Sequence, residues 1–145
     1  MQLKRFRSAW IAVTILAVSS VLAGDVQPSE VTGLEYPLLG RMARITGTVV
    51  VRLTIGPDGS VTNAMSVSGH PLLAKAACEN ARQWKFERAK SERREERDVY
   101  LVYRFLLRGT CAGRDCRQKF SVDLPNLVTV TSEIPPIQVS EDIKK

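Results

Sequence analysis

Histidine is nearly absent from this chain of 145 residues, which has only His70. That residue stands between Gly69 and Pro71, a setting typical of a turn that starts a helix. The chain also lacks a Gly-rich phosphate loop, a nucleophile elbow and a paired metal motif. The sequence therefore predicts that the protein is not an enzyme and has no cofactor and no metal. Carboxylates that are distant in sequence but meet in space are the one catalytic arrangement left open.

Cysteine is also scarce, with three in the chain. Cys111 and Cys116 flank the turn-rich stretch Ala-Gly-Arg-Asp, which could bring their sulfurs together, so a disulfide is predicted between them. Cys78 lies in a helical pattern, where a free cysteine usually behaves as a small buried hydrophobe. A zinc site would need ligand pairs at short spacing, and only Cys111 and Cys116 are close in sequence, which disfavours zinc.

No apolar run reaches the length of about 20 residues that spans a bilayer. The longest, residues 9–23, follows a basic stretch with Lys4, Arg5 and Arg7 and ends in small residues. This order is typical of a cleaved signal peptide, so residues 1–23 predict export to the periplasm. The alternative is an uncleaved anchor in the inner membrane that faces the periplasm, the only membrane contact that the sequence predicts.

The net charge of +6 is smaller in the exported chain, because removing the three basic residues of the export segment leaves +3. Such a charge gives little support to nucleic acid as a partner, and export argues against it. A basic cluster opposed only by Asp115 nevertheless suggests an alternative function, the binding of anionic envelope components through a basic surface. Its members are Arg104, Arg108, Arg114, Arg117 and Lys119.

Alternation of side chains predicts a β-hairpin in the middle of the chain. In residues 46–55, Val49, Val51, Leu53 and Ile55 fall on one face, which is the period of a half-buried strand. An Asp-Gly turn follows at Asp58-Gly59, and residues 60–67 form the returning strand. One face of the hairpin is expected to be buried.

The residues around the hairpin predict an α+β fold. A brief helix is expected within residues 36–45, and a stripe of Leu73, Ala77, Ala81 and Trp84 indicates a second helix that packs on the hairpin. Residues 98–107 alternate as a third strand. The expected architecture is a three-stranded antiparallel sheet with one or two helices on one face. A tail, residues 109–145, holds the two-cysteine loop and a further strand at 127–131.

Taken in order, several short motifs resemble the TonB C-terminal domain. They are Tyr36-Pro37, Arg44-Ile45, Gly47, Pro57-Asp58-Gly59 and Ala81-Arg-Gln-Trp84-Lys-Phe86. The resemblance covers residues 36–108, after a short lead-in at 24–35. A full energy transducer of this family also has a His-bearing membrane anchor and a long Pro-rich spacer, and neither is found in residues 1–35.

The resemblance implies a protein partner, an outer-membrane receptor or transporter, in energy-coupled transport. In that family the partner's segment pairs with a sheet edge as an added strand. The third strand is the expected edge, and it could also pair two copies into a homodimer. Its predicted docking residues are Val99, Leu101, Tyr103 and Phe105. The alternative is that the chain's own tail at 127–131 covers this edge.

Overall fold

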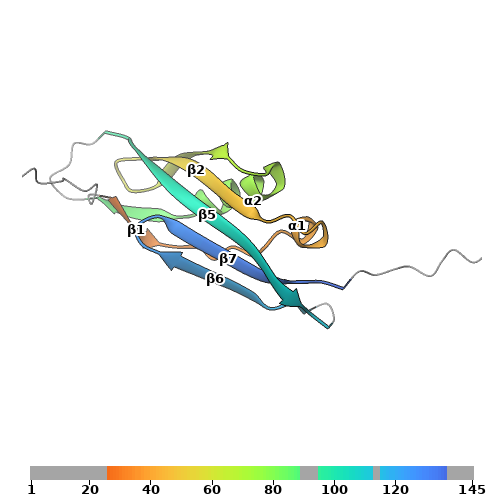
Figure 1. The fold of residues 1–145 in the computed structure, drawn as a ribbon. Helices are drawn as coiled ribbons and strands as arrows, with labels where there is room; N and C mark the ends of the chain where they lie inside the picture. The colour runs from red at the N-terminus through yellow and green to blue at the C-terminus, as the bar shows by residue number, and fades with distance from the viewer. Residues whose placement is uncertain (1–25, 89–94, 113–114, 137–145) are drawn as a thin grey trace, which may run out of the picture.

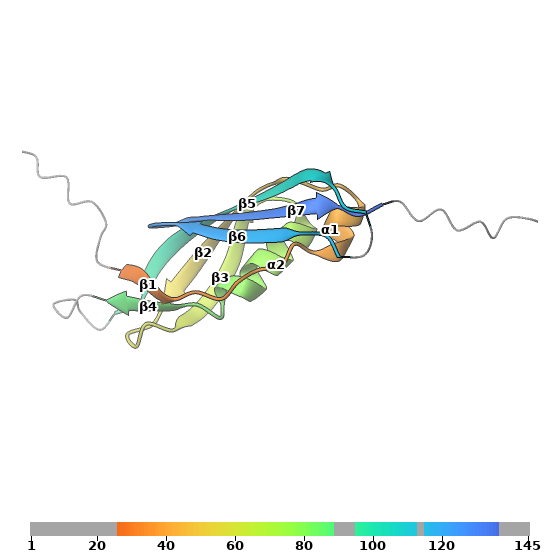
Figure 2. The same ribbon diagram turned by 90° about the horizontal axis from the view of Figure 1, so that it is seen from below.

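The computed structural model describes residues 26–88, 95–112 and 115–136. It contains a five-stranded sheet in the order β3-β2-β5-β7-β6, with two helices on one face (Figures 1 and 2). The strands are β2 (Gly47–Ile55), β3 (Val61–Ser68), β5 (Arg97–Thr110), β6 (Gln118–Asp123) and β7 (Leu127–Ile134). The helices are α1 (Leu38–Met42) and α2 (Pro71–Ala81). The α+β class is confirmed, but the sheet has five strands where three were predicted.

The predicted hairpin is formed by β2 and β3, which pair antiparallel. The side chains of Val49, Val51, Leu53 and Ile55 are all 0% exposed, so the predicted inner face is confirmed. The turn depends on Gly59, whose φ of +83° favours glycine. A Cβ atom at this position would collide with the carbonyl oxygen of Phe86. The hairpin turn is therefore packed against the segment that follows α2.

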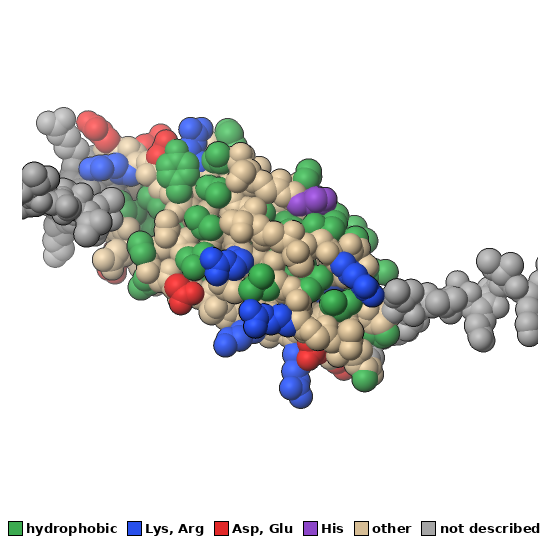
Figure 3. All heavy atoms as spheres, in the orientation of Figure 1, with side chains coloured by type: hydrophobic (Ala, Val, Ile, Leu, Met, Phe, Trp, Pro, Cys, Tyr) green, Lys and Arg blue, Asp and Glu red, His purple; other side chains and the backbone are tan. Residues whose placement is uncertain are grey.

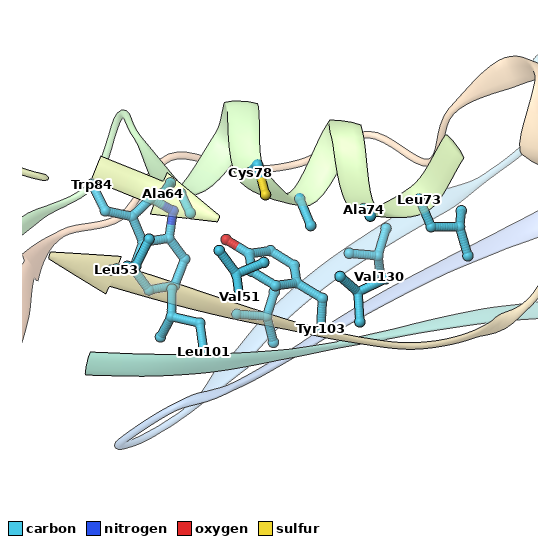
Figure 4. Close-up of a cluster of buried hydrophobic side chains, with 14 of the residues drawn as sticks. Val51, Leu53, Ala64, Leu73, Ala74, Cys78, Trp84, Leu101, Tyr103 and Val130 are labelled. Carbon is cyan, nitrogen blue, oxygen red and sulfur yellow. The ribbon is translucent and has the colours of Figure 1, made fainter. Parts of the chain in front are cut away.

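Helix α2 lies across the inner face of the sheet, and its buried Leu73, Ala77 and Ala81 confirm the predicted stripe (Figure 4). The helix ends at Ala81, earlier than predicted, so Trp84 lies beyond it. The next residues form β4 (Lys85–Arg88), which pairs antiparallel with β1 (Val26–Glu30). Residues 85–88 are therefore extended and not helical. The predicted lead-in, residues 24–35, contains the strand β1.

The tail beyond residue 108 is part of the sheet. β7 contains the predicted strand at 127–131 and pairs parallel with β5, while β6 lies outside β7 and pairs antiparallel with it. The chain therefore passes the end of β7 between β5 and β6, and the Cys111 N–H donates to the Ile134 carbonyl there at 3.1 Å. A disulfide joins Cys111 to Cys116 in this connection, and Cys78 is a buried free thiol.

The helices described here are too short, or too polar, to cross a membrane. The predicted export segment, residues 1–23, lies outside the described residues.

Candidate protein-binding edge

The strand predicted to be the docking edge, β5, lies in the interior of the sheet. It pairs with β2 along residues 97–105 and with β7 from Val102 to Thr110. The Val102 N–H donates to the Asn126 carbonyl at 2.8 Å, so even-numbered residues of β5 point their backbone groups toward the β7 side. Odd-numbered residues therefore point theirs at β2, because direction alternates along a strand.

The predicted docking residues all belong to the odd-numbered set. They are Val99, Leu101, Tyr103 and Phe105, and their pairing partners on β2 are Leu53, Val51, Val49 and Gly47. The prediction of a free edge at these residues was wrong. The alternative is confirmed instead: the chain's own tail supplies the neighbouring strand, β7.

The two outer strands of the sheet are now the candidate edges, and α2 covers part of the first, β3. The Arg82 guanidinium donates from Nη2 to the carbonyl oxygen of Ala64 at 3.1 Å. The Ser66 backbone amide lies at the Cys78 thiol. Burial raises the pKa of that thiol, and the Arg82 charge and the Ser66 hydrogen bond oppose the rise. The side chains of Cys78 in α2 and of Arg82 just after it therefore contact outward backbone groups of β3 at Ser66 and Ala64.

The second outer strand, β6, has an open edge. The Arg117 carbonyl accepts from the Glu133 N–H at 3.1 Å, so the odd-numbered residues of this segment point toward β7. The N–H and C=O groups of Gln118, Phe120 and Val122 consequently point outward. Within the described residues β6 pairs with β7 alone, and Figure 2 shows it along the near side of the sheet.

The core fixes the position of β6. Phe120 and Val122 are partly buried against the hydrophobic core and lie opposite Val130 and Val128 of β7. The side chain of Gln118 accepts a hydrogen bond from the Tyr36 N–H at 2.7 Å. The inner side chains thus hold the strand while its outer backbone groups remain available to another polypeptide. The alternation of Phe120 and Val122 was the available sequence signal for this strand, which the prediction missed.

The predicted basic cluster lies partly beside this edge. Arg104 on β5 and Lys119 on β6 are both exposed on the sheet face away from α2, with β7 between them. Arg108 and Arg117 are exposed near the end of β5 and the start of β6, and Arg114 lies outside the described residues. In Figure 3, which looks onto this face, basic side chains are interspersed with hydrophobic ones. The structure therefore brings Arg108 and Arg117 to one end of the sheet, with Lys119 near them on β6, and places Arg104 farther along β5.

Across the described ranges, no three His, Cys, Asp or Glu side chains are grouped so that they could hold a metal ion. Asp58 is a turn residue, since its carboxylate accepts hydrogen bonds from the Ser60 hydroxyl at 2.7 Å and from the Ser60 N–H at 3.1 Å. These hydrogen bonds lower the pKa of the Asp58 carboxyl. Asp58 therefore has a structural function in the hairpin.

A β-hairpin crossed by a helix, a third strand beside it and an open edge at the border define a small α+β binding module. The family model for the Gram-negative bacterial TonB protein C-terminal matches residues 32–106, just over half of the chain. The chain belongs to this family, and the resemblance found in the sequence is confirmed. A search of curated proteins finds no match. The family's domains are non-enzymatic protein-interaction modules of periplasmic type.

The family match ends within β5, so β6 and β7 lie outside the matched residues. The open edge of this chain is thus formed by a segment that the family model does not describe.

Proposed function

We propose that this chain is a TonB-like periplasmic module that contacts an outer-membrane transport protein by accepting an extended segment of it along β6. Such a contact would serve energy-coupled transport, the role that the family resemblance implies. The observation that carries the proposal is the outward row of backbone groups at Gln118, Phe120 and Val122, which no other strand of the described residues pairs with.

Strand addition needs little more than such a row, because main-chain hydrogen bonds supply the affinity. The other outer strand is a poorer acceptor, since Arg82 already occupies the carbonyl oxygen of Ala64. An added strand beside β6 would place alternate side chains next to Lys119 on the open face. A partner segment with an acidic residue at such a position is therefore favoured over a basic one.

Photo-crosslinking in intact envelopes tests this proposal. A photoreactive residue replaces Lys119 on β6 in one variant and Asn63 on β3 in the matched control; both positions are exposed and lie on outer strands. We expect Lys119 to yield an adduct with a membrane-embedded transport protein and Asn63 to yield none. Adducts from Asn63 alone would contradict the proposal.

Salt distinguishes this mode from the alternative function. Strand addition depends on backbone hydrogen bonds, so the adduct should persist when ionic strength is raised to about 1 M, where the Debye length is about 3 Å. An interaction lost on adding salt would instead support the binding of anionic envelope components by Arg104, Arg108, Arg117 and Lys119.

A further inference from the structure

Helix α1 is packed the opposite way round from an ordinary surface helix. Its buried residue is Gly40, whose Cβ position would lie 3.4 Å from atoms of Leu73 and of Tyr36. Its large side chains point to solvent: Leu38 is 57% exposed, Leu39 63% and Met42 65%. Burial of apolar surface drives folding and binding. A helix that buries glycine and exposes three large hydrophobes is therefore expected to contact another molecule through those side chains.

The three hydrophobes share one surface. Residues three and four positions apart lie on the same side of a helix, which groups Leu38 and Leu39 with Met42. Five of the eight large exposed hydrophobes in the described residues are spread over the rest of the chain, while this five-residue helix holds the other three. The concentration marks α1 as an interaction surface.

Basic side chains lie at the same end of the molecule as this surface. The start of α1 is fixed beside β5 and β6. The ring centroids of Tyr36 and Phe105 are 5.3 Å apart, and the Tyr36 N–H donates to the side-chain oxygen of Gln118. Figures 1 and 2 show α1 at the same end of the molecule as the last residues of β5 and β7. The basic residues of this end on or near α1 are Arg41, Arg44, Arg108 and Arg117, whereas Lys119 projects from the opposite face of the sheet.

These cations outnumber the acidic side chains near them, which are Glu35, Asp115 and Glu133. None of these four cations forms a salt bridge within the described residues, where the ion pair between Lys85 and Glu30 is at the opposite end of the molecule. Arg41 also has its Nε buried without a hydrogen-bond partner. Within the described residues, the guanidinium groups at the α1 end are thus not paired with a carboxylate in a salt bridge.

We propose that the α1 end docks on the surface of an anionic phospholipid bilayer, with Leu38, Leu39 and Met42 among the acyl chains and the cations of this end at the phosphates. Shallow burial of an apolar helix face plus attraction to anionic lipid is how interfacial helices bind membranes. A bilayer accommodates protruding aliphatic side chains without a matching groove, so a short helix at the tip of the molecule can insert into it.

Site-specific fluorescence tests which end of the molecule meets lipid. Protein recovered from the periplasm carries an environment-sensitive dye on Met42→Cys or, as the matched control, on Leu124→Cys. Met42 is 65% exposed and Leu124 is 68% exposed, and Leu124 lies in the β6–β7 turn, away from α1. Cys78 is buried, and the unsubstituted protein gives its background labelling.

Vesicles of phosphatidylglycerol mixed with phosphatidylcholine should shift the emission of the dye at position 42 to the blue and leave the dye at position 124 unchanged. Vesicles of phosphatidylcholine alone should shift neither. In unlabelled protein, the double change Leu39→Gln and Met42→Gln should weaken vesicle binding at least tenfold, and Leu124→Gln should not change it. Both side chains are exposed, so folding is preserved.

Three results would overturn the lipid assignment. The first is an equal shift at positions 42 and 124, and the second is equal binding to neutral and anionic vesicles. The third is unchanged vesicle binding in the glutamine double variant, which would show that Leu39 and Met42 do not contact the lipid. The readout at α1 is independent of crosslinking at β6, so either proposal can fail alone.

Discussion

The hydroxyl of Tyr103 on β5 donates a hydrogen bond of 3.0 Å to the side-chain oxygen of Asn80 on α2. The same oxygen accepts from the indole N–H of Trp84 at 3.1 Å. The Asn80 amide nitrogen donates to the carbonyl oxygens of Thr32 and Gly33 at 2.9 Å and 3.1 Å. One buried amide thus ties the helix to the sheet, to the segment after α2 and to the segment before α1.

Replacing Asn80 by alanine should therefore lower the free energy of unfolding by about 2–4 kcal/mol. The change leaves buried donors on Tyr103 and Trp84 without an acceptor, and each such group costs about 1–3 kcal/mol. Urea unfolding followed by tryptophan fluorescence measures the loss. Asn63→Ala, at an exposed position on β3, is the matched control and should stay within about 0.5 kcal/mol of the parent. A loss for Asn80 no larger than that for Asn63 would refute the proposed role.

Stability should fall in alkaline solution. Burial raises the pKa of Tyr36 to about 12. Burial, with a smaller contribution from Cys78, raises the pKa of Tyr103 as well. A phenol whose pKa is higher in the folded state ionises first in the unfolded state, near its ordinary value of 10.0. The stabilisation is therefore complete below about pH 10 and is lost progressively as the pH rises above it.

Urea midpoints measured between about pH 8 and about pH 11 test this expectation. Tyr103→Phe should reduce the decline above about pH 10, because phenylalanine has no proton to lose. Tyr100→Phe, on the exposed face of the same strand, should leave the decline as it is in the parent. An unchanged slope in Tyr103→Phe would contradict the assignment of the decline to this side chain.

The sequence predicted the parts of the fold that local patterns encode. The hairpin was visible because Val49, Val51, Leu53 and Ile55 recur at every second position among β-branched residues and an Asp-Gly turn follows. The helix stripe was visible because Leu73 and Ala77 recur at helical spacing. Each of these patterns spans neighbouring residues, so no knowledge of tertiary pairing was needed to find it.

The sequence did not predict which strand forms the edge of the sheet. Periodicity shows that residues 98–107 are extended with one face buried, but it does not show what pairs with either side of them. That outcome depends on β7, which joins β5 in parallel from more than a dozen residues further along the chain. Because β7 pairs with β5, the candidate docking site is on β6 and not on β5. The pairing of β4 with β1 likewise could not be read from local periodicity, and it accompanies the end of α2 before Trp84.

Ala77 should not tolerate a larger side chain. It is 0% exposed where α2 crosses the sheet, and its methyl group leaves no room for added atoms. Ala77→Leu should reduce the free energy of unfolding by about 1–3 kcal/mol through overpacking. Lys75→Leu, an exposed position on the same helix, controls for the general effect of leucine in α2. Chemical denaturation of both variants decides; a neutral Ala77→Leu would show that the helix face is assigned wrongly.

The three cysteine thiols should become reactive toward a thiol reagent in a fixed order. Cys111 and Cys116 are joined, so neither should react with a thiol reagent in the absence of reductant. Cys78 is free, but it is buried and its thiol pKa is raised, mainly by desolvation, so little reactive thiolate is exposed near neutral pH. Folded protein should therefore show no rapidly reacting thiol, and protein unfolded in urea should show one.

Adding reductant before unfolding should raise the count to three, and Cys78→Ala should remove the single thiol seen without it. The oxidised pair lies in the connection that carries the chain past the end of β7 to the open edge at β6. Reduction should consequently increase hydrogen exchange in β6 more than in β2, which lies in the interior of the sheet between β3 and β5. Three reactive thiols in unreduced, unfolded protein would show that Cys111 and Cys116 are not paired.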